Sequence, residues 1–418
     1  MSKTKLMLLA TVATGVLMQP ASALEAQAFV DRVAEVYKTI GYELDFGPAT
    51  LDGDTITVDG VTVGLANMPA AEGEAPAEPM VMDTPITFSG VTERPDGGYM
   101  AETVTIPDID TDFAADPVGH VTLSDIVLDG FYVPGGETVP AVGVIQLWQA
   151  FSTGPLSVSR DGKEVFTYDS VKAAYDFLPE QGSADLESVS GTLAVNGLSL
   201  DLTSMQEEDP TAAATIEALG LTQVTGDITQ DLSWSMADGH MVIDKFLFDF
   251  DDVGALDINL DLTGLTPAVL DQIYAMQAQM AVPAGETPTE EQAQAQMMQG
   301  MAIMQGVSIV SANVRYDDAS LAGKLLDMFA EQAGVDRAAY VEGLKSTLPA
   351  IIAQSGIPAL NDVVVPPVSA FLDDPKSLEV KIAPPSPTSI LVLAAAAANP
   401  AGLISALGLL VEANQPAQ

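Results

Sequence analysis

Six methionines form the densest group of side chains with metal-binding chemistry in this sequence. They are Met276, Met280, Met297, Met298, Met301 and Met304. Thioether sulfurs at i and i+4 on a helix can hold Cu(I). The same spacing is typical of residues that face a core, and flexible thioethers also line adaptable apolar grooves. We therefore predict core packing or the lining of an apolar ligand groove for these methionines, in preference to a copper site.

The sequence contains two histidines that could bind a metal, His120 and His240. His120 follows a Pro-Val-Gly segment and His240 follows an Asp-Gly pair, so both are predicted on the surface or at strand ends. Two histidines this far apart are a weak basis for a zinc site. The chain has no cysteine, which removes thiolate ligands, disulfides and a cysteine nucleophile. We predict neither a bound metal nor a cofactor.

The run Asp108-Ile-Asp-Thr-Asp112 resembles the opening of a calcium-binding loop. An EF-hand requires glycine at its sixth position and glutamate at its twelfth, where this chain has Phe113 and Gly119. The three aspartates are therefore interpreted as the polar face of a strand end.

Local catalytic motifs are absent from the sequence. It lacks the Gly-x-Ser-x-Gly elbow, the His-Glu-x-x-His motif, the P-loop and the dinucleotide-binding glycine pattern. Carboxylate pairs such as Asp317-Asp318 arise by chance in a chain with 58 acidic residues, and this pair is placed to begin a helix. We assign no catalytic residue. A hydrolase built from acidic residues distant in sequence is the least favoured functional class.

The charge balance excludes one large class of partners. Fifteen basic residues stand against 58 acidic ones, which gives a formal net charge of −43. Such a field repels nucleic acids and anionic lipid headgroups, so we predict no nucleic-acid partner. The acidity fits either solubility in a salty medium or the capture of cations, and the scattering of the acids along the chain favours solubility.

The first 23 residues have the three regions of a secretory signal peptide. Lys3 and Lys5 precede an uncharged run over residues 6–18, and Ala21 and Ala23 form an A-x-A cleavage site. The run is too short to span a bilayer, which needs about 20 apolar residues. We expect cleavage near Ala23 and a mature protein in the periplasm of a Gram-negative bacterium.

The apolar pattern of the N-terminal two thirds predicts one helix and then many strands. Residues 24–66 are predicted to hold an amphipathic helix and a first hairpin turning at Asp59-Gly60, because alternating strands around Asp-Gly are a strong hairpin signal. Residues 67–84, rich in Pro, Ala, Glu and Gly, are predicted as a loop. Asp-Gly and Asn-Gly pairs recur at Asp129-Gly130 and Asn196-Gly197. We interpret them as turns of an antiparallel hairpin sheet over residues 85–266.

The C-terminal third changes to helical spacing. Residues 267–376 are predicted as a helical region with one strand, with Thr287, Asp318 and Asp336 as helix caps. Residues 377–418 are predicted as a closing strand and an apolar cap.

The uncharged stretch over residues 390–411 has the length of a membrane span. Asn399-Pro400 interrupts it and no Lys or Arg flanks it. We therefore predict two short helices hinged at Pro400 and a final strand over residues 409–412.

Four C-terminal segments carry a resemblance to known proteins. They are Ala312–Leu321, Ala370–Leu378, Pro384–Pro387 and Val411–Asn414. They resemble a group of uncharacterised secreted proteins of alphaproteobacteria, a family of unknown function whose long amphipathic hairpins look like those of the YdgA and AsmA type of envelope protein. The resemblance implies a periplasmic role, a large curved antiparallel sheet and a hydrophobic groove. It supplies no catalytic residues.

These observations predict an α+β fold. Its large curved antiparallel β-sheet of long hairpins would carry an N-terminal helix and C-terminal helices packed on one face. The favoured function is that of a non-enzymatic periplasmic protein that binds an apolar or lipid-like ligand in a groove between sheet and helices. The alternative is a structural or interaction protein of the cell envelope, with a protein partner and no ligand. Peripheral contact with a membrane stays open in both cases.

Overall fold

A computed structural model describes most of the chain. The described residues are 24–39, 41–65, 79–115, 117–136, 147–179, 186–204, 210–280, 290–354, 356–357, 359–397 and 400–416. The predicted signal peptide with Ala21 and Ala23, most of the predicted loop and the predicted cap Thr287 lie outside these residues.

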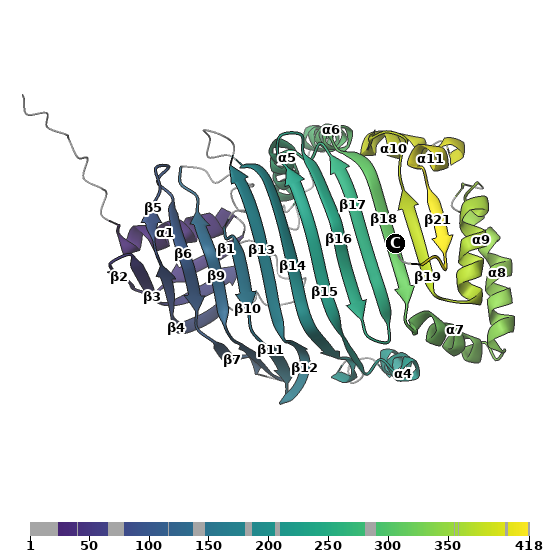
Figure 1. Ribbon diagram of the computed structural model, residues 1–418, viewed down its shortest axis with the longest axis horizontal. Helices are drawn as coiled ribbons and strands as arrows, with labels where there is room; N and C mark the ends of the chain where they lie inside the picture. The colour runs from purple at the N-terminus through teal and green to yellow at the C-terminus, as the bar shows by residue number, and fades with distance from the viewer. Residues whose placement is uncertain are drawn as a thin grey trace, which may run out of the picture.

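One antiparallel sheet of 21 strands organises the described residues (Figure 1). Its strands are β1 (Tyr42–Phe46), β2 (Ala49–Asp52), β3 (Thr55–Leu65), β4 (Met80–Ser89), β5 (Thr92–Glu93), β6 (Tyr99–Ile106), β7 (Ile109–Ala115), β8 (Val118–Leu123), β9 (Ile126–Val133), β10 (Ala150–Thr153), β11 (Leu156–Arg160), β12 (Lys163–Tyr168), β13 (Ser170–Pro179), β14 (Leu186–Asp201), β15 (Gln223–Ser235), β16 (His240–Phe250), β17 (Gly254–Thr263), β18 (Ser308–Asp318), β19 (Ser377–Ile382), β20 (Thr388–Ser389) and β21 (Leu410–Ala413). The predicted loop over residues 67–84 is too long at its C-terminal end, because β4 begins at Met80.

Strand pairing follows the chain order closely. From β3 the sheet runs through β4, β6, β9, β10 and β13, and from there through β14, β15, β16, β17, β18 and β19 to β21. Strands β7, β8, β11 and β12 form a side branch that joins β14. Most long strands therefore pair with the next strand in sequence, as short turns between antiparallel strands require.

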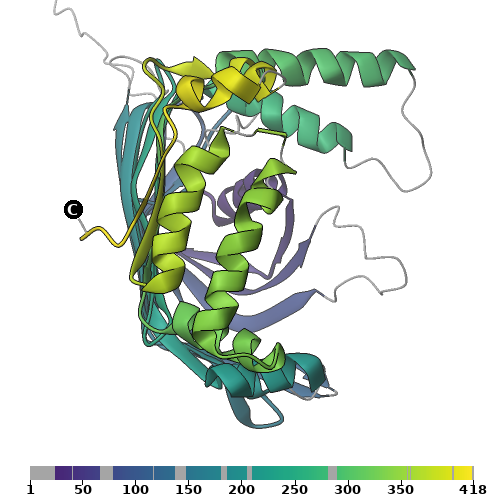
Figure 2. The same ribbon diagram turned by 90° about the vertical axis from the view of Figure 1, so that its right-hand side faces the viewer.

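The helices lie on one side of the sheet. They are α1 (Ala26–Thr39), α4 (Pro210–Leu219), α5 (Pro267–Met280), α6 (Glu290–Gly306), α7 (Leu321–Gln332), α8 (Arg337–Ala353), α9 (Leu360–Asp373), α10 (Ile390–Ala397) and α11 (Pro400–Leu407), with a short 3₁₀ turn over Leu202–Ser204. Figure 2 shows the sheet curving around this helical side, so the helices occupy its concave face. The predicted fold class, a curved antiparallel sheet with an N-terminal helix and C-terminal helices, is confirmed.

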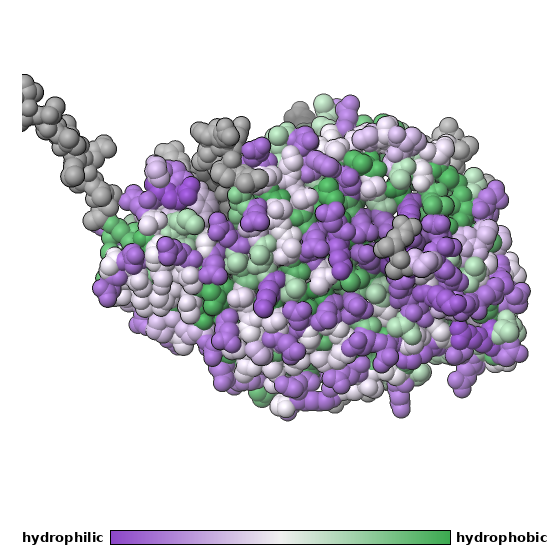
Figure 3. Space-filling model, viewed as in Figure 1, coloured by the Kyte–Doolittle hydropathy of each residue, from purple (hydrophilic) through white to green (hydrophobic). Residues whose placement is uncertain are grey.

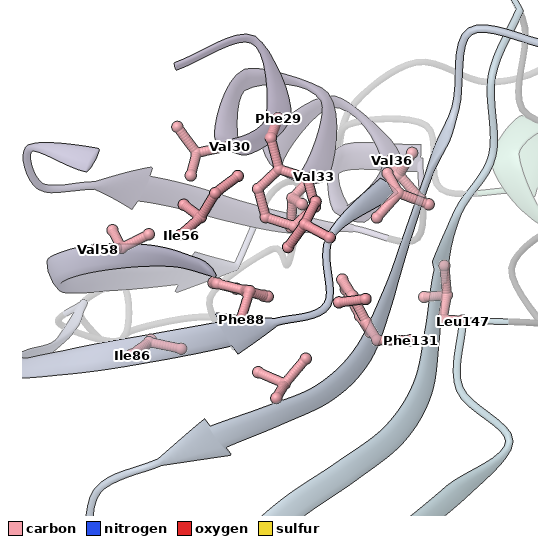
Figure 4. Close-up of a cluster of buried hydrophobic side chains, with 14 of the residues drawn as sticks. Phe29, Val30, Val33, Val36, Ile56, Val58, Ile86, Phe88, Phe131 and Leu147 are labelled. Carbon is pink, nitrogen blue, oxygen red and sulfur yellow. The ribbon is translucent and has the colours of Figure 1, made fainter. Parts of the chain in front are cut away.

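The best-packed core lies at the N-terminal end, where α1 covers the first strands (Figure 4). Phe29 of α1 is fully buried, and its ring meets Phe88 edge-on at 4.9 Å and Tyr99 at 5.4 Å between ring centroids. Val33 and Val36 of the same helix face also are buried. The three-and-four spacing predicted this helix, and the covered strands supply Ile56 and Val58.

Three of the Asp-Gly and Asn-Gly pairs bend strands, whereas Asp52-Gly53, Asp161-Gly162 and Asp238-Gly239 lie at turns between strands. Gly60 lies inside the continuous strand β3, where the register against β4 shifts between Asp59 and Val61. Gly130 and Gly197 likewise lie inside β9 and β14. All three have a positive φ, which is the conformation of the glycine in a β-bulge. The predicted hairpin at Asp59-Gly60 is therefore wrong, and the first turn falls earlier, between β2 and β3.

The C-terminal predictions agree better with the structure. Asp336 caps α8, since its side chain accepts a hydrogen bond from the Ala339 N–H at 2.8 Å. Asp318 accepts from the Ala322 N–H at 2.8 Å at the start of α7. The uncharged stretch forms α10 and α11, with α11 beginning at Pro400, and then β21. Within the described residues, no helix combines the length and apolar character that crossing a membrane requires.

Candidate functional site

Side chains of each strand alternate between the two faces of the sheet. We define the inner face as the one that carries the helices. Phe88 contacts α1 on this face, Trp234 and Leu270 of α5 belong to one apolar cluster there, and Tyr316 meets Phe371 of α9 at 6.4 Å between ring centroids. The outer face is the convex one.

Apolar residues cover the inner face across six neighbouring strands, β14 to β19. The register places Ile228 beside Phe248, then Leu256, then Tyr316 and Leu378. We call the apolar inner-facing residues of these strands the open inner face: Leu193, Val195, Ile228, Phe246, Phe248, Leu256, Ile258, Leu260, Val314 and Val380.

None of the residues of the open inner face is fully buried. Nine of them are half-buried, and Val314 is 43% exposed although β18 has neighbouring strands on both sides. By contrast, the same face of the sheet is closed under α1, where Ile56 and Val58 are 0% exposed. The helices therefore seal one end of the inner face and leave its middle accessible.

The open inner face is long in the direction that crosses the strands. Six neighbouring strands span five gaps of about 4.8 Å, which is roughly 24 Å. One leaflet of a bilayer contributes about half of the ~30 Å hydrocarbon thickness. The face is therefore longer than the hydrocarbon depth of one leaflet.

Apolar contacts and uncharged tyrosines border the open inner face. Trp234 and Val189 are buried under Leu270 and Leu265, and the Trp234 Nε1–H donates to the Leu265 carbonyl at 2.8 Å. Desolvation by burial raises the pKa of Tyr316, and its hydroxyl donates to Asp318 at 2.8 Å. Desolvation also raises the pKa of Tyr175, an inner-facing residue of β13. Both phenols stay uncharged at neutral pH.

The outer face behind the open inner face is polar. Figure 3 shows hydrophilic side chains over much of this face, with smaller apolar areas between them. A shallow depression of about 650 Å³ lies here. At its base the Arg315 guanidinium donates to Asp317 at 2.5 and 2.7 Å and to Glu379 at 3.4 Å, and Lys381 pairs with Glu379 at 3.1 Å. These charged groups pair with one another, so we interpret the charges at the base of the depression as a structural ion network.

The six methionines predicted to pack in the core or line a groove lie on α5 and α6. Met297, Met298 and Met301 project from α6 with exposed fractions of 64%, 62% and 40%. Met276 and Met304 are half-buried, and the side chain of Met280 lies outside the described residues. The methionines are absent from the lining of the 650 Å³ depression and from that of a second, polar depression of about 400 Å³ beside Lys163 and Asp201.

The two histidines each meet aspartates. His120 Nδ1 lies 2.8 Å from Asp112 and its Nε2 lies 3.1 Å from Asp110. His240 Nε2 lies 2.8 Å from Asp261. The two carboxylates at His120 approach opposite ring nitrogens, so the three groups do not converge on one point. No cluster of potential metal ligands occurs among the described residues.

The alternating strand pattern, and not the methionine spacing, corresponds to the open inner face. The open inner face comes from strands such as Leu256-Asp-Ile-Asn-Leu-Asp-Leu262, whose alternation predicts an apolar face. The alternation of apolar and polar residues does not show whether helices cover that face. The methionines were singled out because they lie close together in sequence. Closeness in sequence does not determine whether a side chain faces the sheet or the solvent.

Comparison with known proteins gives a match to a protein family without a described function. No curated protein matches the chain. A family model described only as an uncharacterized protein matches residues 247–414, which is less than half of the chain but includes β17 to β21 and all four segments of the predicted resemblance. Over this range the chain is similar to an uncharacterised protein family.

Proposed function

We propose that this chain is a non-enzymatic, exported protein that binds a lipid-like apolar ligand on the open inner face. The observation that carries the proposal is Val314, an apolar residue on an interior strand that is 43% exposed. Water on such a surface costs about 25 cal/mol per Å² of apolar area. An acyl chain lying across the strands would remove that cost.

Two further features support this proposal. The predicted signal peptide favours a periplasmic location, where lipids that move between membranes need apolar cover. The likeness of the long hairpins to those of YdgA and AsmA type envelope proteins points the same way, since it implies a hydrophobic groove. The enzyme alternative gains no support from Asp201 and Asp238, because hydrogen bonds from Thr203 and Ser235 respectively lower their pKa and disfavour a role as general acid.

The second candidate is a structural or interaction protein of the envelope without a ligand. It would be favoured by a fully packed interior, and the half-buried residues of the open inner face argue against such packing. An envelope protein partner that covers this face would reconcile the two functions.

The test combines solvent extraction of the purified protein, mass spectrometry of the extract and titration with a fluorescent fatty acid. Val314→Lys places a charge on the open inner face and is expected to weaken binding at least about tenfold. Val81→Lys is the matched control. Val81 is 56% exposed and pairs with Thr62, one residue before the inner-facing Met82 in β4.

Equal loss of probe binding in both variants, or no binding and no extracted lipid from the parent protein, would refute ligand binding. Crosslinking in cells that traps one protein through position 314 would then favour the interaction protein.

A further inference from the structure

We propose that four helices along one margin of the sheet form the surface by which this protein docks onto a lipid bilayer of low negative charge. We call this surface the uncharged rim and define it by the described residues of α10 and α11, those of α6 after Glu291, and those of α5 other than Asp271. The inference rests on the proposed lipid-binding function and adds to it the place where lipid would enter.

The rim is assembled by the tertiary structure from two distant parts of the chain. Helix α5 contacts α6, α6 contacts α10, and α10 contacts α11. The backbone N–H of Ile390, the first residue of α10, donates to the Val307 carbonyl at 3.0 Å, which ties the second part to the start of β18. Figures 1 and 2 show the four helices together at the upper margin of the sheet.

Helix α6 exposes three methionines. Met297, Met298 and Met301 are exposed, whereas Gln296, Gln299, Ile303 and Met304 are half-buried. Most large apolar residues of a helix in a soluble fold are turned toward the core. A group of exposed apolar side chains marks an interaction site, and on a helix such a group is what enters the interface of a bilayer.

Other exposed apolar residues extend the surface beyond α6. Val392 of α10 is 54% exposed and Tyr274 of α5 is 49% exposed. Tyrosine is favoured at the level of lipid headgroups because it joins an apolar ring to a polar hydroxyl. These residues add to the three methionines on the helices of the same margin.

Charge distinguishes the rim from the rest of the molecule. The chain carries a formal charge of −43, yet α10 and α11 contain no charged residue, and α6 contains none after Glu291. Asp271 is the one charged residue of α5. A protein this acidic is repelled by anionic lipid. Zwitterionic lipid meets no such barrier at the rim, so the occupant that fits by charge is a bilayer rich in zwitterionic headgroups.

The rim is continuous with the open inner face. Leu270 of α5 packs on the Trp234 cluster of that face, and β20, which leads into α10, pairs with the start of β18. A lipid that left the bilayer at the rim would reach the inner face without crossing the acidic outer face.

The test is vesicle flotation with protein that begins at Leu24. One set of vesicles holds phosphatidylethanolamine and phosphatidylcholine, and a second set replaces half of the lipid with phosphatidylglycerol. The rim variant is Met297→Gln, Met298→Gln and Met301→Gln together. The matched control is Val118→Gln, Val335→Gln and Ile351→Gln, three exposed apolar residues outside the rim.

We expect the parent and the control to float with the zwitterionic vesicles, and the rim variant to bind them at least about tenfold less. Phosphatidylglycerol should weaken binding of the parent, and added salt should restore it because salt screens the repulsion. Binding of a soluble fluorescent fatty acid should be the same in the rim variant and the parent. This separates failure of the rim from failure of the inner face.

Three results would overturn the proposal. The rim variant could float as well as the parent, the parent could bind only the anionic vesicles, or light scattering could show a dimer of the parent that the rim variant abolishes. The last result would assign the rim to a second copy of this chain instead of a bilayer.

Discussion

Arg315 is 7% exposed while Val314, the preceding residue on the same strand, is 43% exposed. Burial of a charged side chain and exposure of an apolar one reverses the usual order. The reversal has two local causes. On the outer face, Asp317 and Glu379 hold the guanidinium and the Gln415 carbonyl accepts from it at 2.8 Å. On the inner face, the helices leave the middle strands uncovered.

The buried ion network predicts a large loss of stability for Arg315→Met. The change removes the guanidinium from Glu379, a carboxylate that is 6% exposed, and leaves it with Lys381 at 3.1 Å as its ion-pair partner. Breaking a buried pair by removing one partner costs about 3 kcal/mol or more. Urea denaturation measures the free energy of unfolding. Arg337→Met is the control, because its pair with Asp327 is exposed and should contribute under about 1 kcal/mol. Similar losses in the two variants would contradict the structural role of the network.

The N-terminal core predicts a loss of about 3–5 kcal/mol for Phe29→Ala, which leaves a cavity between Phe88 and Tyr99. Thermal unfolding followed by circular dichroism would show it. Phe113→Ala removes a ring that is 62% exposed and should change stability by less than about 1 kcal/mol. If the Phe29 variant unfolded like the parent, α1 would not be packed as described.

The bulge in β3 predicts different outcomes at two glycines. At Gly60, with φ of 83°, an added Cβ would lie 2.6 Å from the Met82 carbonyl oxygen, whereas at Gly53, with φ of 67°, nothing lies within 4 Å. Gly53→Ala should therefore cost only the strain of a left-handed backbone, about 1 kcal/mol. Gly60→Ala should cost clearly more, because the clash adds to that strain. Chemical denaturation of both variants measures the difference, and equal losses would argue for a turn at Gly60.

The burial of Tyr37 predicts that this tyrosine ionises later than an exposed tyrosine as the pH rises. Desolvation by burial raises the pKa of Tyr37 to about 12, with a smaller contribution from Tyr42. In the unfolded chain a tyrosine ionises near pH 10. A raised folded-state pKa means that the stabilisation is complete below about pH 10 and is lost as the pH rises toward 12, by at most about 3 kcal/mol.

Tyr37→Phe should lack this loss between pH 10 and 12, and the late component of the tyrosinate absorbance should fall by the share of one tyrosine, because Tyr316 and Tyr175 also titrate late. Phenylalanine keeps the aromatic ring and lacks only the ionisable hydroxyl, so packing around position 37 is preserved in the variant. An unchanged late component together with a smaller component near pH 10 would show that Tyr37 ionises with the unperturbed tyrosines.

The sequence by itself determined the elements whose signals are local. Helical spacing fixed α1, the side chain of Asp336 fixed the start of α8, and Pro400 fixed the division of the uncharged stretch into two helices. Each depends on residues within one or two turns of each other, which is why spacing alone was sufficient.

The tertiary structure decided the outcomes that depend on distant partners. Gly60 continues a strand because β4 pairs past it, and Met297 faces solvent because α5 and α10 take the other side of α6. The same holds for the candidate site. Alternation in β14 to β19 determines that one face is apolar, but whether that face is buried or open depends on where the helices pack. That placement is set by contacts between segments far apart in sequence, on which local periodicity carries no information.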